Sequence, residues 1–158
     1  MDNLFLPGVA FDNYGQIADP AAGANYTDIT LFGAGTRYQL IALSFTLTTD
    51  ATAGTRRVQL VWRFDHTSLT EQELICCQAQ VAQEPSTAVR YFVAPGYADS
   101  ATIVDLRCLI RMPFPLELWV PSGAGTGWTM DSDVDGMVAG DQLSNARFWC
   151  RIARGAPL

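Results

Sequence analysis

The chain is constrained most by residues 38–65, where apolar and polar side chains alternate along two segments. One side of the first segment carries Ile41, Leu43, Phe45 and Leu47, and one side of the second carries Val58, Leu60, Trp62 and Phe64. Successive side chains of a strand point to opposite faces, so this pattern predicts two half-buried antiparallel strands. The connection 49–55 is short and rich in turn-forming residues, which predicts a hairpin.

Strand patterns of the same kind recur toward the end of the chain. We expect further strands at residues 74–82, 89–93, 102–110, 116–120 and 146–152. A helical turn is expected only at residues 68–73. Short strands with frequent turns and no long helix predict an all-β fold. The expected form is an antiparallel β-sandwich of jelly-roll type, with a closed barrel as the alternative.

Residues 1–36 differ from the domain expected at residues 37–158. They hold four of the chain's acidic residues and no basic one, so they supply −4 of the net charge of −6. They also carry scattered apolar side chains that follow neither a helical nor a strand period. The segment is too apolar for a solvated disordered tail. We expect an extended N-terminal arm that lies either on its own domain or on a neighbouring subunit.

Composition narrows the class of protein. The 158 residues are 49% hydrophobic, but no apolar run approaches the roughly 20 residues that cross a bilayer. The first residues show no secretory signal, so we expect synthesis in the cytoplasm and no membrane partner. All ten basic residues are Arg and form no basic stripe, which disfavours nucleic-acid binding.

The four cysteines have no zinc-type spacing. They are Cys76, Cys77, Cys108 and Cys150, and the last three fall on the buried side of their predicted strands. A buried free thiol behaves as a small hydrophobe. We therefore expect reduced thiols rather than disulfides or a metal centre.

An acidic run offers a candidate cation site. Asp131, Asp133 and Asp135 followed by Gly136 match the opening of a calcium loop, with Asp141 as a further carboxylate. Position twelve of such a loop is normally Glu, but here it is Gln142. The competing interpretation is an acidic turn between strands.

No catalytic arrangement stands out. The single histidine, His66, ends a predicted strand without a motif around it, and no nucleophile elbow is present. The four glutamates have no recognisable catalytic context. We therefore expect a non-enzymatic protein without a cofactor or small-molecule ligand.

Surface aromatic and arginine residues indicate a protein interface, because these types dominate binding hot spots. The arm contributes apolar side chains to this set, and the outward sides of the predicted strands contribute the rest. The candidate interface residues are Phe5, Leu6, Phe11, Tyr14, Tyr91, Arg107, Trp119, Arg147 and Trp149.

Three segments resemble small β-sandwich virion accessory proteins of tailed bacteriophages. Residues 35–51 (GTRYQLIALSFTLTTDA), followed by 56–58 (RRV), resemble their opening hairpin. Residues 138–147 (VAGDQLSNAR) resemble their closing hairpin, and residues 118–123 (LWVPSG) are similar to the strand and turn before it.

This resemblance implies a capsid decoration or cement subunit on the outer capsid surface. It implies contact with the major capsid protein and with itself, commonly as a homotrimer. It supplies no catalytic residue. The alternatives are a tail, collar or head-fibre module that binds another virion protein or a host glycan, and a small β-barrel enzyme or calcium-dependent lectin built around Asp131, Asp133 and Asp135.

Overall fold

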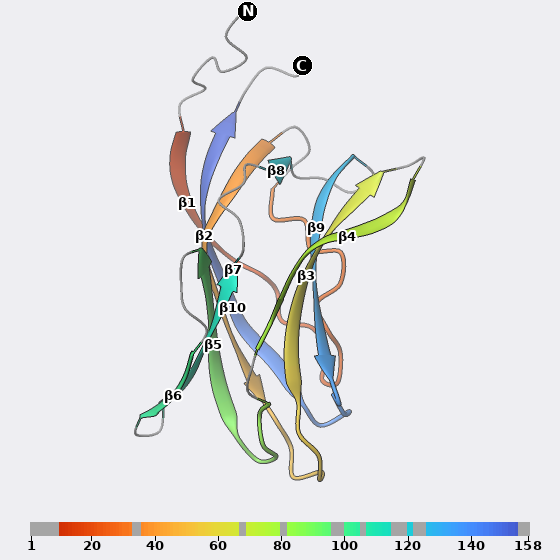
Figure 1. Cartoon of the computed structure of the whole chain (residues 1–158), viewed down its shortest axis with the longest axis vertical. Coiled ribbons are helices and arrows are strands. Elements are labelled where there is room, and N and C mark those ends of the chain that lie inside the picture. Colours follow the sequence, from red (N-terminus) through yellow and green to blue (C-terminus); the bar gives the residue numbers. More distant parts are fainter. Residues whose placement is uncertain are drawn as a thin grey trace, which may run out of the picture.

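The computed structural model describes residues 10–32, 36–66, 69–79, 82–95, 100–104, 107–114, 120–121 and 126–154. These residues form strands and turns, and no helix occurs among them (Figure 1). The strands are β1 (Ala10–Gln16), β2 (Thr36–Thr48), β3 (Arg57–His66), β4 (Leu69–Gln78), β5 (Ala88–Pro95), β6 (Ser100–Val104), β7 (Arg107–Phe114), β8 (Val120–Pro121), β9 (Thr126–Asp135) and β10 (Gln142–Arg154). The all-β prediction is confirmed for the described part of the chain.

The strands make two separate sheets (Figure 1). The larger sheet has the order β1-β10-β2-β5-β7-β6, with β8 also paired to β2, and the smaller has the order β4-β3-β9. All pairings are antiparallel except the parallel pair β5–β7. The described strands therefore do not close into a single barrel.

The predicted hairpin of residues 38–65 is wrong in its pairing. β2 pairs with β10, β5 and β8, whereas β3 pairs with β4 and β9, so the two strands belong to different sheets. The connection after β2 crosses from one sheet to the other. Alternation reports that a strand has one buried side, but it does not report which strand lies beside it.

One hydrophobic cluster joins the two sheets. Leu43, Phe45 and Leu47 on β2 share it with Val58 and Leu60 on β3, all 1% exposed or less. The other strands complete the cluster with Val89, Tyr91, Val93, Met130, Val134, Leu143, Ala146, Phe148 and Cys150. Burial of one such large apolar side chain stabilises the fold by about 1.5–3 kcal/mol. The inward sides predicted for Leu43, Phe45 and Leu47, for Val58 and Leu60, and for Ala146, Phe148 and Cys150 are confirmed.

Two irregularities change which side of a strand is buried. β2 has one extra residue, Ile41, between the pairs Trp149↔Ala42 and Cys150↔Leu40. A bulge of this kind reverses the alternation, so Leu40 is buried and Ile41 only partly. β10 has an extra residue at its start, where Asn145 adopts a φ of 54°.

Residues 10–32 lie on their own domain. β1 pairs along its whole length with β10, and Ile17 and Tyr26 enter the core. Ile29 and Met130 exchange two backbone hydrogen bonds of 3.0 Å, which places residues 26–29 beside β9. Residues 1–9 lie outside the described part.

Several other expectations need correction. Residues 69–73, predicted as part of a helical turn, belong to strand β4. The single strand expected at 102–110 is instead the antiparallel pair β6 and β7, which meet at Val104↔Arg107. The strand expected at 116–120 is described only at Val120, in β8.

Candidate functional site

Five exposed side chains form one surface on the outer side of β1 and β10. This β1–β10 face consists of Asp12, Tyr14, Arg147, Trp149 and Arg151. Tyr14 lies opposite Trp149 in the strand register, and Asp12 lies opposite Arg151. With 59% and 48% exposure, Tyr14 and Trp149 are the exposed large hydrophobic residues of the described part.

Alternation along β10 produces this surface. Phe148, Cys150 and Ile152 point into the core, so the residues between them point outward. On the inner side of β1, Gly15 leaves room for the ring of Phe148, because a side chain there would collide with that ring.

Polar contacts order the β1–β10 face. Arg147 Nη1 donates a hydrogen bond to the Tyr14 hydroxyl at 2.9 Å. Arg151 Nε lies 3.4 Å from Asp12 Oδ1, and both side chains are 50% exposed. Two cations, an acid and two aromatic rings are thus exposed together at one surface.

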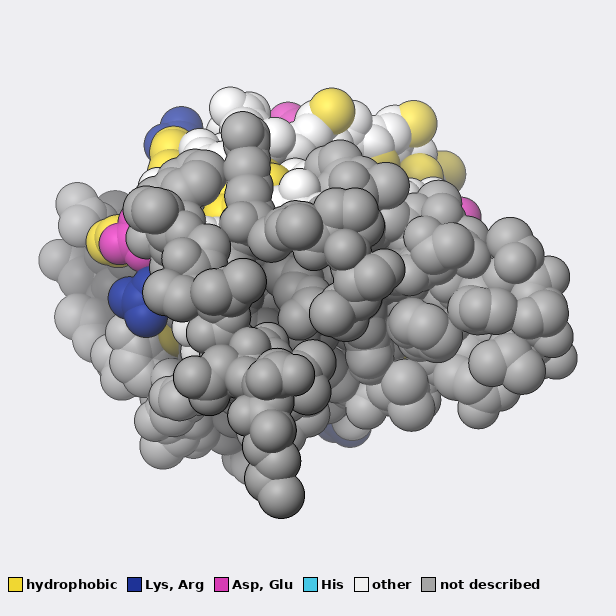
Figure 2. All heavy atoms as spheres, turned by 90° about the horizontal axis from the view of Figure 1, so that it is seen from above, with side chains coloured by type: hydrophobic (Ala, Val, Ile, Leu, Met, Phe, Trp, Pro, Cys, Tyr) yellow, Lys and Arg dark blue, Asp and Glu magenta, His cyan; other side chains and the backbone are white. Residues whose placement is uncertain are grey.

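The outer side of the larger sheet is also positive relative to the rest of the described surface. Arg90 points outward on β5, so this side holds three of the four described arginines that are exposed, against one acid, Asp12. The remaining described surface exposes Asp19, Asp28, Glu84, Asp133 and Asp135 against Arg57. Figure 2 shows arginine, acidic and hydrophobic side chains adjoining at one margin, seen from the end where the chain termini lie.

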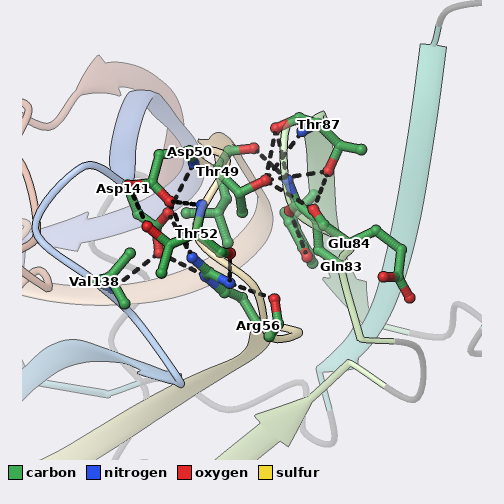
Figure 3. A network of polar contacts seen from close by, with 12 residues as sticks. Thr49, Asp50, Thr52, Arg56, Gln83, Glu84, Thr87, Val138 and Asp141 are labelled. Carbon is green, nitrogen blue, oxygen red and sulfur yellow. Dashed lines mark hydrogen bonds and ion pairs between the residues drawn. The ribbon is translucent and has the colours of Figure 1, made fainter.

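A second polar cluster is buried at the opposite end, where three turns meet (Figure 3). Arg56 is 1% exposed, and its Nε donates to Asp141 Oδ2 at 2.8 Å. Its Nη2 contacts Asp141 Oδ1 at 3.3 Å and Asp50 Oδ1 at 3.2 Å. Its Nη1 donates to the carbonyl oxygens of Thr52 and Gly54. All three guanidinium nitrogens therefore have acceptors.

The third turn joins this cluster through Gln83. Its backbone exchanges hydrogen bonds of 2.6 and 2.9 Å with Arg56, and its Oε1 accepts one of 3.1 Å from the Tyr91 hydroxyl. Thr49 also donates to the Glu84 carbonyl at 2.8 Å. We call Arg56, Asp141, Asp50, Gln83 and Thr49 the turn clamp.

Asp141 is the most deeply buried carboxylate of the turn clamp, at 0% exposure. Burial alone raises the pKa of this carboxyl. The hydrogen bond from Arg56 and those from the backbone N–H groups of Val138 and Asp50 outweigh it, so its pKa lies below the usual value. The clamp has a structural role, because its hydrogen bonds join three separate turns of the chain.

The calcium loop is not formed. Asp131, Asp133 and Asp135 lie in strand β9, not in a loop, and Gly136 begins the turn with a φ of 78°. Asp131 is buried and forms an ion pair of 2.5 Å with Arg63, while Asp141 belongs to the turn clamp. Among the described residues, no group of three or more His, Cys, Asp or Glu side chains is placed to hold a metal ion.

Two buried groups are less acidic than usual. Burial, with the charge of Asp19, raises the pKa of the Tyr26 hydroxyl to about 12. Burial also raises the pKa of the Cys150 thiol to about 12, so this thiol is protonated at neutral pH. Cys150 is free and buried as predicted; the side chains of Cys76, Cys77 and Cys108 lie outside the described part.

The remaining candidate interface residues have different outcomes. Tyr91 is 0% exposed, so its predicted outward position is wrong: it stacks on Phe45 with ring centroids 5.2 Å apart. The backbones of Phe11 and Arg107 lie in β1 and β7, with side chains outside the description, as for His66. Phe5, Leu6 and Trp119 lie outside the described residues.

Sequence reasoning missed Arg56. The local sequence Thr55-Arg56-Arg57 presents two adjacent arginines, and only a partner 85 residues away distinguishes the buried one.

No helix of the described part is long and apolar enough to cross a membrane. Comparisons with protein-family models, curated proteins and solved structures find no match to this chain.

Proposed function

We propose that this chain is a non-enzymatic structural protein of a phage virion, a capsid decoration or cement subunit that bridges neighbouring capsomers. The observation that carries the proposal is the order of the strands. With residues 26–29 counted as a short strand beside β9, and with β6, β7 and β8 of the larger sheet set aside, the remaining antiparallel strands have the orders β1-β10-β2-β5 and (26–29)-β9-β3-β4. This is the strand order of a jelly-roll β-sandwich, a fold used by viral capsid proteins and by lectins.

A fold alone does not assign a function, so the proposal also needs a surface. The β1–β10 face supplies one, because exposed aromatic and arginine side chains are the types that contribute most to protein–protein binding. Tyr14, Arg147 and Trp149, predicted from sequence as interface residues, lie together there. The resemblance of residues 35–51 and 138–147 to phage virion proteins points to the same class of protein.

The second candidate is a tail, collar or head-fibre module that binds another virion protein or a host glycan. The neighbouring rings of Tyr14 and Trp149 favour it, since an exposed aromatic ring offers an apolar surface for stacking against a sugar. Arg147 and Asp12 beside the rings supply a donor and an acceptor for sugar hydroxyls.

The test is binding of the purified full chain to capsids of the encoding phage assembled without it. We expect saturable binding at a fixed copy number and a higher melting temperature of the shell, because a ligand of the assembled state stabilises that state. Removing residues 2–9 leaves β1 in place and tests the arm separately.

Two outcomes would redirect the assignment. Absence of the protein from purified virions by mass spectrometry, together with no capsid binding, would overturn the virion proposal. Glycan-array binding that Trp149→Ala abolishes, without capsid binding, would establish the second candidate instead.

A further inference from the structure

β1 is the edge strand of the larger sheet, and β10 is its one partner among the described strands (Figure 1). The two strands pair over the whole of β1 without a bulge, and β1 contains no proline and no lysine. Natural proteins usually protect an edge strand with such residues, with a bulge or with a covering segment. Within the described part, β1 therefore presents a regular edge that lacks these protections.

The register identifies the backbone groups that point toward this free edge. Ile17 follows the last listed pair of β1, and its N–H donates to the Ala146 carbonyl at 2.9 Å. In antiparallel strands, residues alternate between bonding the neighbouring strand and pointing away from it. Every second residue of β1 therefore directs its N–H and C=O groups to the free edge. These residues include Asp12, Tyr14 and Gln16.

A hollow of about 320 Å³, open to solvent, adjoins the end of this edge. Its wall combines Gln16 and Ile17 with residues 28–31, which continue the segment beside β9. Ile17 and Phe148, which also line it, point inward from their strands, so the hollow lies on the inner side of the edge. A strand added to β1 would pass this hollow with alternate side chains directed into it. In such additions, backbone hydrogen bonds give affinity and pockets for alternate side chains give specificity.

The surroundings of the free edge are acidic. Asp12 lies on β1, Asp28 lies in the wall of the hollow, and Asp19 follows the end of β1; all three are exposed. Asp12 has Arg151 at 3.4 Å, but neither Asp19 nor Asp28 has an ion pair with another described residue. An added strand with basic side chains would therefore complement this edge.

The same charges disfavour the strands that this chain could itself supply. Residues 1–9 contain Asp2 and no basic residue, and Asp12 is the single charged residue of β1. Either segment would bring acid toward acid, and like charges on adjacent strands are destabilising.

We propose that the free edge of β1 and the adjoining hollow bind an extended, basic segment of another protein, which adds a strand to the larger sheet. This inference rests on the proposed function only in placing that protein in the virion, and its test needs no capsid.

The experiment is amide hydrogen exchange of the full chain by NMR, alone and with a probe peptide. The probe is a blocked synthetic peptide of alternating valine and threonine with arginine at two positions, matched to β1 in length. In the free chain, the N–H groups of Tyr14 and Gln16 should exchange fast, and those of Asn13 and Gly15 slowly. At a peptide concentration about ten times the Kd, exchange at Tyr14 and Gln16 should slow by about tenfold, because only the free chain exchanges.

Variants separate the backbone contribution from the charge. Gln16→Pro removes an N–H that does not bond β10, at a position where an edge strand tolerates proline. It should weaken peptide binding by about tenfold or more. Asp28→Asn removes a charge and suits the left-handed backbone there, with a φ of 50°, and should weaken binding by about two- to fivefold. Asp133→Asn, an exposed residue of β9, is its matched control and should leave binding unchanged. Circular dichroism melts check that each variant is folded.

Two N-methylated peptides test the geometry without altering the protein. Only alternate N–H groups of an added strand face β1, so methylation of one alternate set should abolish binding and methylation of the other should not. Slow exchange of Tyr14 and Gln16 in the free chain, no protection at about 1 mM peptide, or equal effects of the two methylated peptides would each overturn the inference. Equal effects of Asp28→Asn and Asp133→Asn would overturn the basic character of the partner. Capsid binding without peptide binding would leave the proposed function standing alone, and peptide binding by a protein absent from virions would do the reverse.

Discussion

Two arginine–aspartate contacts in this chain have the same chemistry and opposite surroundings. Arg56 and Asp141 in the turn clamp are 1% and 0% exposed, with N–O contacts of 2.8 and 3.3 Å. Arg151 and Asp12 on the β1–β10 face are each 50% exposed and 3.4 Å apart. Breaking the first leaves a charge stranded away from water, whereas breaking the second leaves both charges hydrated.

This difference divides the molecule into two functional regions. The turn clamp joins the turns after β2 and β9 to the Gln83 turn before β5, so it holds both sheets in register at one end. The β1–β10 face leaves its polar groups partly exposed to solvent. The stability of the fold should therefore respond to changes in the turn clamp. The capsid binding proposed above should respond to changes in the β1–β10 face.

The largest expected effect is that of Asp141→Ala. The change removes the carboxylate from buried Arg56 and from two backbone N–H groups, so it should lower the free energy of unfolding by about 3–5 kcal/mol. Urea unfolding followed by circular dichroism measures it. Asp133→Ala, on the exposed side of β9, is the control and should change stability by about 0.5 kcal/mol or less. Equal effects of the two changes would contradict the clamp.

The clamp also predicts an acid dependence. Because the pKa of Asp141 is lowered in the folded protein, its contribution is complete above the unfolded-state pKa of about 3.9 and is lost as the pH falls through the lower folded-state pKa. The stability gap between wild type and Asp141→Asn should therefore be constant near neutral pH and narrow below about pH 4. Urea unfolding at a series of pH values tests this. A gap that widens on acidification would show the opposite sign of the pKa shift.

Periodicity predicted the buried sides of strands much better than their partners. The alternating residues of β2, β3 and β10 report burial directly, since one period applies along each straight stretch. Pairing of β2 with β10 rather than β3 depends on contacts about a hundred residues away. The reversal at Ile41 arises from a bulge against β10, which no local pattern of β2 reveals.

The candidate site was predicted only in part, because alternation reports which side of a strand is exposed but not which strand lies beside it. Trp149 and Arg147 follow from regular alternation in β10, and both are exposed. In β5, the adjacent Tyr91 and Phe92 are both aromatic, so the pattern does not tell which side is buried; outward Arg90 turns Tyr91 inward. The acidic run looked like a cation loop because spacing cannot show that β3 pairs along it.

The next effect in size compares two tyrosines. Tyr91→Phe removes the donor to Gln83 Oε1 in the core and should cost about 1–2 kcal/mol of stability. Tyr14→Phe removes only an exposed contact with Arg147 and should leave stability almost unchanged. Parallel urea unfolding of both variants makes the comparison. If Tyr14→Phe lowers stability and Tyr91→Phe does not, the assignment of stability to the turn clamp rather than to the β1–β10 face is contradicted.

The smallest expected effect is that of Asp12→Ala. An exposed ion pair gains little in water, so the change should lower the free energy of unfolding by less than about 0.5 kcal/mol at low salt. In about 0.5 M salt even this difference should vanish, because the screening length then falls to a few ångströms. The same salt should not rescue Asp141→Ala, whose loss comes from a buried charge without its partner. Salt dependence thus separates the two arginine–aspartate contacts. If the loss of stability in Asp12→Ala persists in high salt, the pair of Asp12 and Arg151 helps to hold β1 to β10. If the loss disappears, the pair contributes little to the fold.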